Sequence, residues 1–103
     1  MTPSLIHHPL ATFGSTLPAD TDHLLAITTA GALLLIHVPE GEYGFEEHNQ
    51  PEFIVCLQGQ LDMETNDGQE VTALAGEMIE VTPGVRHRFA PSTNAVVMTL
   101  TQR

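Results

Sequence analysis

From residue 24 onward, hydrophobic and polar positions alternate over short runs that are separated by turn residues. In the run "QLDMET", Leu61, Met63 and Thr65 fall on one face of an extended chain, and their polar neighbours fall on the other face. The pair Asp67–Gly68 then gives a hairpin signal before the next run. No run has the period and length of an ordinary amphipathic helix. The pattern therefore predicts strands at residues 24–28, 32–38, 43–48, 52–58, 60–65, 69–74, 77–82, 86–90 and 95–101.

Many short strands at near-regular spacing are typical of a sandwich or a barrel, and the connections here are too short for helical crossovers. We therefore expect an all-β fold, a single-domain antiparallel β-barrel or jelly roll over residues 24–103. The chain has 103 residues, enough for one domain with its own core. Residues 1–23 show no clear period, and we expect them to form an N-terminal arm. The sequence leaves open whether this arm is mobile or pairs with the sheet edge of a second subunit.

The charge balance excludes some classes of partner. The formal net charge is −10, and the sequence has three arginines and no lysine. Nucleic acids and anionic membranes need clustered basic residues, so we expect neither as a partner. The single cysteine, Cys56, has no internal disulfide partner and is expected to pack as a small hydrophobe. The first residues lack a signal-peptide pattern, and the apolar run 30–36 is too short to span a membrane. We therefore expect a cytoplasmic protein.

Polar residues capable of binding a metal fall on inward faces of the predicted strands. Glu46 and His48 are two positions apart and share a face, while Glu47 points the other way. Glu52 begins an otherwise apolar inward row, and His87 shares its face with an aromatic residue. Buried carboxylates are costly unless they are paired, protonated or neutralised by a cation. Two imidazoles and a carboxylate are the ligand set of many non-haem iron sites, and Glu46 could add a fourth ligand.

The same stretches resemble the two sequence motifs of the cupin family. The segment "GEYGFEEHNQPEFIVCLQG", which ends at Gly59, resembles the first motif, G-x5-H-x-H-x3-E-x6-G. The segment "GEMIEVTPGVRHRFAP" resembles the second, G-x5-P-x-G-x2-H-x3-N, with Gly76 and Gly84 in register. With the hairpin between them, the motifs extend over residues 41–91, about half of the chain. Three positions depart from the pattern: Glu46 replaces the first histidine, Thr82 the proline and Pro91 the asparagine.

The resemblance implies a divalent transition metal, Fe, Mn, Ni or Zn, with His48, Glu52 and His87 as ligands at matching positions. Glu46 is a chemically competent ligand at a position that does not match. Two carboxylates and two imidazoles would leave a divalent ion formally neutral and favour the harder ions manganese, iron and nickel. If Glu46 is not a ligand, it is a solvated carboxylate, an acceptor for an imidazole N–H or a general base.

The cupin family includes enzymes, storage proteins and sensors, so two functions remain open at this stage. One is a metal-dependent enzyme of the oxygenase or isomerase type that acts on a small organic molecule. The other is a non-catalytic module that binds or senses a small ligand or a metal. The resemblance also implies a homodimer, because small cupins commonly pair through sheet edges.

Other residues have simpler expected roles. Arg86 and Arg88 are expected to face away from the pocket and to pair with Glu80 or Glu77. Four further histidines are expected at surface or structural positions: His7, His8, His23 and His37. Four residues are expected in the core or in a cavity wall: Met63, Met78, Met98 and Phe89.

Overall fold

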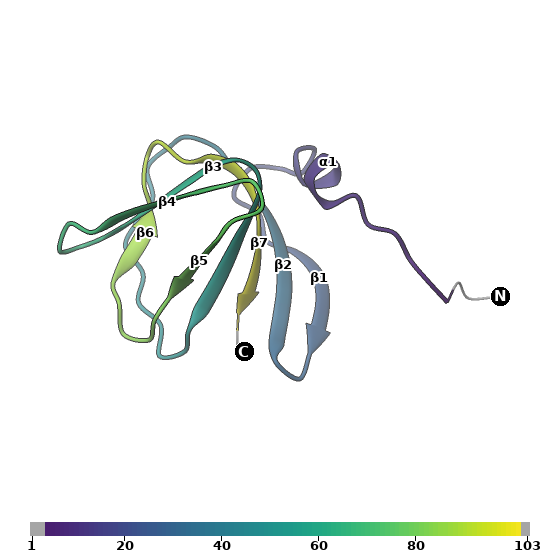
Figure 1. The fold of residues 1–103 in the computed structure, drawn as a ribbon, viewed down its shortest axis with the longest axis horizontal. Helices are drawn as coiled ribbons and strands as arrows, with labels where there is room; N and C mark the ends of the chain where they lie inside the picture. Colours follow the sequence, from purple (N-terminus) through teal and green to yellow (C-terminus); the bar gives the residue numbers. More distant parts are fainter. Residues whose placement is uncertain (1–3, 102–103) are drawn as a thin grey trace.

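The computed structural model describes residues 4–101, and in this part of the chain one short helix accompanies seven strands (Figure 1). Every pairing between the strands is antiparallel, which confirms the predicted all-β fold. The elements are α1 (Leu10–Gly14), β1 (His23–Thr28), β2 (Gly31–Val38), β3 (Glu52–Thr65), β4 (Glu70–Leu74), β5 (Met78–Val81), β6 (His87–Phe89) and β7 (Asn94–Thr101).

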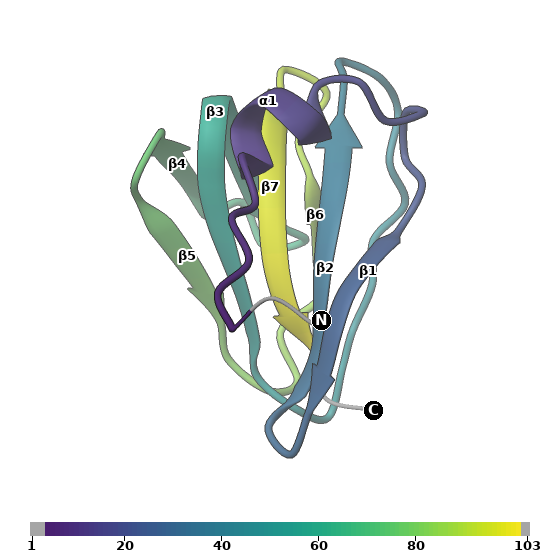
Figure 2. The same ribbon diagram turned by 90° about the vertical axis from the view of Figure 1, so that its right-hand side faces the viewer.

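The strands form one curved sheet in the order β1-β2-β7-β3-β4, and β5 and β6 also pair with β3 (Figure 2). The 14-residue β3 replaces the two strands predicted at 52–58 and 60–65. It stays continuous through an irregularity between Cys56 and Gln58, where it pairs with β7. Gly59 follows with φ +82°, and a Cβ there would lie 2.1 Å from the Asn94 carbonyl oxygen. Only glycine fits at this bend, which closes the sheet around its interior.

The core fills the inner face of this sheet. Its residues come from β2, β3, β4, β5 and β7, and Leu61 and Val97 are fully buried. Cys56 is also fully buried, and burial raises the pKa of its thiol. Met63 lies in the core as expected, but the same expectation for Met78 is wrong, because its side chain is 54% exposed. Met78 pairs with Val55 on the outer face of β3.

The predicted strand at 43–48 is wrong as well. These residues form a loop whose one sheet contact is an isolated bridge between Glu46 and His87. Alternating residues predict an extended chain, but a strand also needs a neighbour along its length. The backbone of the loop therefore pairs with β6 at one point only, although side chains of β6 also pack against the loop.

The N-terminal arm begins outside the barrel. Residues 4–9 extend away from it (Figure 1), and Leu5 and Ile6 are 92% and 68% exposed. The helix α1 then packs on the outer face of β2 and β7, where a Cβ on Gly14 would lie 2.3 Å from Val96 Cγ1. His37 Nδ1 lies 3.3 Å from the Leu17 carbonyl oxygen, a structural contact between β2 and the arm. Within residues 4–101, no helix is long and apolar enough to cross a membrane.

Candidate metal centre

His87 is positioned by a tight turn at the start of β6. The Val85 N–H donates to the Thr82 carbonyl oxygen at 3.3 Å, with Pro83 and Gly84 in the central positions. Gly84 has φ +81°, as the third residue of a type II turn requires. Because Pro83 supplies the fixed φ of the second position, replacing the motif proline with Thr82 leaves the turn intact. The turn directs the His87 side chain inward, and the residue as a whole is 4% exposed.

Backbone hydrogen bonds hold the 43–48 loop against this turn and against β6. The Glu46 N–H donates to the His87 carbonyl oxygen at 2.7 Å, and the His87 N–H donates back to Glu46 at 2.9 Å. The Gly84 N–H donates to the His48 carbonyl oxygen at 2.9 Å. The two halves of the candidate centre, which are far apart in sequence, are thus connected through their own backbones.

The Arg88 side chain fixes the same loop from its other side. Its guanidinium carbon lies 4.4 Å from the ring centre of Phe45, and its Nη1 donates to the Tyr43 carbonyl oxygen at 3.4 Å. Its Nε donates to Glu64 Oε1 at 2.6 Å. The expectation that Arg88 faces away from the pocket and pairs with Glu80 or Glu77 is therefore wrong. Arg88 is the register partner of Glu64, so the two side chains lie side by side on β6 and β3.

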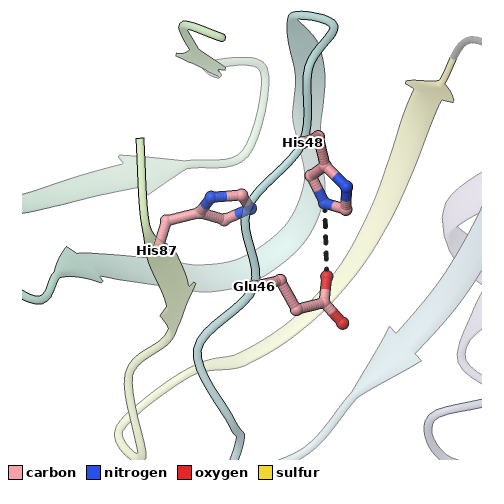
Figure 3. Close-up of side chains that lie close together, drawn as sticks. All are labelled: Glu46, His48 and His87. Atoms are coloured by element: carbon pink, nitrogen blue, oxygen red, sulfur yellow. Dashed lines mark ion pairs between the residues drawn. The ribbon is translucent and has the colours of Figure 1, made fainter. Parts of the chain in front are cut away.

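Three side chains converge between the loop and β6 (Figure 3). One possible ligand atom from each of Glu46, His48 and His87 lies within 4.8 Å of the other two. Glu46 Oε2 is 3.4 Å from His48 Nε2, and the two imidazole ring centres are 5.3 Å apart. This histidine and carboxylate group could hold a metal ion, because its donor atoms can approach one centre without a change of fold.

Glu52 approaches the group through His87. The His87 Nδ1 lies 2.8 Å from the Val85 carbonyl oxygen, which can only accept, so Nδ1 carries the proton. In the neutral ring, Nε2 is then an acceptor, and it lies 3.3 Å from Glu52 Oε1. Two acceptors at this distance need a proton or a cation between them or beside them. The four predicted site residues thus share one neighbourhood, with Glu52 beside His87 and outside the group of three.

A cavity of about 710 Å³ opens next to these residues, and all four line it. One part of its wall is apolar, formed by Leu34, Ile36, Val38, Met63 and Phe89, while most of the other lining residues are polar or charged. Sequence reasoning missed several of its polar residues, among them Tyr43, Thr99, Asp20 and Asp22. The Tyr43 hydroxyl lies 2.8 Å from Asp20 Oδ1 and 2.7 Å from the Pro39 carbonyl oxygen. Burial, and then the hydrogen bond and charge of Asp20, raise the pKa of Tyr43 far above its usual value.

Comparisons with known proteins point to one family. The family model for the cupin domain matches residues 34–101, about two thirds of the chain. No curated protein matches the sequence significantly.

Solved structures share the fold at low sequence identity. A cupin-2 domain protein of Shewanella frigidimarina is 25% identical, with a TM-score of 0.78 and 89% of each chain covered. A protein of Neisseria meningitidis is 17% identical, with a TM-score of 0.79, covering 95% of this chain and 100% of that one. A DMSP lyase of Ruegeria pomeroyi is 17% identical, with a TM-score of 0.62, covering 74% of this chain and 40% of the lyase.

Proposed function

Because the chain belongs to the cupin family, we propose that it is a small cupin that binds one divalent transition-metal ion and acts on a small organic molecule as a metal-dependent enzyme. The ligands are His48, His87 and Glu52, with Glu46 as the fourth. Within the family fold, the DMSP lyase of Ruegeria pomeroyi supports an enzymatic function.

One observation supports the proposal most strongly: the contact between His87 and Glu52. The Val85 carbonyl fixes the proton on Nδ1 of His87, so Nε2 presents a lone pair to Glu52 Oε1 at 3.3 Å. His87 is buried, so water does not separate the two acceptors as it would at the surface. A divalent cation bound to His87 and Glu52 would remove this conflict, and Glu46 and His48 each bring a possible ligand atom to within 4.8 Å of one on His87.

Different side chains of the cavity have different proposed roles. A bound ion would supply Lewis acidity or oxygen activation, and its open positions would take oxygen atoms of the substrate. Glu46 and His48 lie at the exposed side of the group, with side chains 68% and 41% exposed, so a substrate that enters from solvent meets them first. The apolar wall excludes water from the body of the substrate. If Glu46 is not bound to the ion, its carboxylate is in place to take a proton from a substrate held beside His48.

Metal binding can be tested directly. Purified protein should hold about one equivalent of metal by mass spectrometry, and adding Mn²⁺, Fe²⁺, Ni²⁺ or Zn²⁺ to metal-free protein should raise its melting temperature. Glu52→Gln and His87→Ala should each lower metal affinity by at least about 100-fold, because each removes a ligand. Glu42→Gln removes an exposed carboxylate outside the cavity and should leave affinity unchanged. Unchanged metal-dependent melting in both site variants would contradict the proposed site.

A second measurement separates an enzyme from a binding module. Oxygen uptake by the iron(II) protein across catechols, diketones and thiols, with an isomerisation assay alongside, should identify at least one turned-over class. His87→Ala should abolish that turnover. A protein that binds metal but turns over nothing in either assay would instead support the non-catalytic module that binds or senses a ligand.

We further propose that the protein is a homodimer. Outward-facing residues of β2, β7 and β3 form two apolar rows. In one row, Leu33 pairs with Leu100, which pairs with Phe53; in the other, Leu35 pairs with Met98, which pairs with Val55. Except for Leu35, they keep part of their surface exposed in the single chain. The arm, in which Leu5 and Ile6 are exposed apolar residues, extends from the same side (Figure 2). A second copy would cover both.

A further inference from the structure

The cavity carries an excess of negative charge at its opening. Beside the candidate ligands, its lining includes three exposed carboxylates: Asp20, Asp22 and Glu47. Asp20 is close to the Tyr43 hydroxyl, and the other two are free of ion pairs within residues 4–101. A cleft lined by charges of one sign concentrates their field and attracts ligands of the opposite sign.

The arginine that lines the cavity does not offset these carboxylates. Arg88 is the one arginine among the lining residues that the structure describes, and the sequence contains no lysine. The Arg88 guanidinium is already paired with Glu64 at 2.6 Å and stacked on Phe45. Glu46 adds to the effect, since a second carboxylate ligand brings a divalent ion to formal neutrality. An anionic ligand therefore gains little from the metal and is repelled at the opening.

Thr99 indicates that a ligand occupies the cavity beyond the metal. It lies on β7 between Leu34 of β2 and Ile54 of β3, and it lines the cavity. It is 3% exposed, and its Oγ1 is the one buried side-chain polar atom without a hydrogen-bond partner in residues 4–101. Native folds rarely leave a buried polar atom without a hydrogen-bond partner. Because Thr99 Oγ1 lacks one and its residue lines the cavity, we take it as evidence for a ligand there.

Resting on the proposed function of this cavity, we propose that its ligand is a small organic cation, an amine with an apolar body, and that carboxylates and phosphates are excluded. The ammonium group lies among the carboxylates at the opening. The apolar body lies against Leu34, Val38 and Met63, within reach of the Thr99 side chain.

Three probes of matched size test this selectivity: benzylamine, benzyl alcohol and benzoate, which at pH 7 are positive, neutral and negative. Their dissociation constants are measured by NMR titration of the full chain, in the zinc-loaded and the metal-free forms. Benzylamine should bind at least about tenfold more tightly than benzoate in both forms, with benzyl alcohol between them. Raising the salt concentration to about 0.5 M should narrow the gap, because the carboxylates at the opening are exposed.

Two double variants locate the origin of the selectivity. Asp22→Asn with Glu47→Gln removes two charges from the cavity opening and should reduce the benzylamine-to-benzoate ratio by at least about threefold, with benzyl alcohol unchanged. Glu42→Gln with Glu70→Gln changes the net charge equally outside the cavity lining and should leave the ratio unchanged.

Each contrary outcome is decisive. Absent benzylamine binding, or benzoate binding as tight as benzylamine in either form, overturns the proposal. An equal fall of the ratio in both double variants also overturns it, because net charge alone would then explain the preference. If the protein binds no metal, the proposed function fails, and the titrations of the metal-free form still decide the selectivity.

Discussion

Glu46 stands where the cupin motif has a histidine, and its side chain is 68% exposed, against 41% for His48 and 5% for His87. Residue parity predicted correctly that Glu46 and His48 share a side, although the strand assumed for that inference is absent. The same rule placed Glu47 on the opposite face, and that prediction is wrong, because Glu47 lines the cavity together with Glu46 and His48. A loop without a paired neighbour does not have to keep the alternation of a strand. Sequence could not supply the proton position of His87, which depends on the Val85 carbonyl.

Thr99 supports a prediction about a single hydroxyl group. Thr99→Val should raise the free energy of unfolding of the metal-free protein by about 1 kcal/mol, because valine fills a similar volume and removes an unpaired buried hydroxyl. Thr99→Ser keeps the hydroxyl and loses a buried methyl group, so it should lower the same quantity by about 1 kcal/mol. Urea denaturation at pH 7 measures both. If Thr99→Val does not raise the free energy of unfolding, the Thr99 hydroxyl already has a hydrogen-bond partner in solution and is no longer evidence for a ligand.

The strands show what periodicity can and cannot predict at the level of elements. It predicted β1, β2, β4, β5, β6 and β7 to within about one residue at each end. Periodicity divided β3 into two strands, because glycine is typical of turns. In the structure, Gly59 instead forms a bend within one continuous strand. Periodicity also made 43–48 a strand, because alternation does not reveal whether an extended segment has neighbours.

The loop at 43–48 depends on a side chain that sequence reasoning placed elsewhere. Arg88→Met keeps the aliphatic stem and removes the guanidinium from Phe45, from the Tyr43 carbonyl and from Glu64. It should lower the free energy of unfolding by about 2 kcal/mol, since Glu64 is left half-buried without its partner but solvent still screens part of the cost. The loop should also open more often.

Amide hydrogen exchange measures that opening at Glu46 and His87, whose N–H groups bond across the gap. Exchange at both amides should accelerate by at least about tenfold in Arg88→Met, and metal affinity should fall with it. Arg86→Met is the matched control, because Arg86 lies farther from Phe45, at 5.7 Å. Equal protection in wild type and Arg88→Met would mean that the backbone bridge alone holds the loop.

At the scale of the whole molecule, the spacing of short strands predicted the barrel, and the two motifs predicted which residues form its polar group. They could not predict α1, because its five residues have no hydrophobic period and are held by a close approach at Gly14. Nor could they show that the outer face of β2, β7 and β3 is apolar over two rows of paired residues. The two rows form only when β2, β7 and β3, which are far apart in the sequence, pair in one particular register, and the sequence pattern does not give that register.

The apolar outer face and the arm lead to a prediction about assembly. Sedimentation equilibrium should give a dimer of the 11.2 kDa chain at micromolar concentrations. Leu5→Asp with Ile6→Asp should weaken the association at least about tenfold and leave the melting of the barrel unchanged, because both residues lie outside the core. Val71→Asp, at a 40% exposed position on β4, is the control for adding charge at an apolar surface residue and should leave association unchanged.

A monomeric wild type would contradict the dimer. A dimer that the arm variant does not weaken would restrict the interface to the sheet face, where Val55 and Met98 meet.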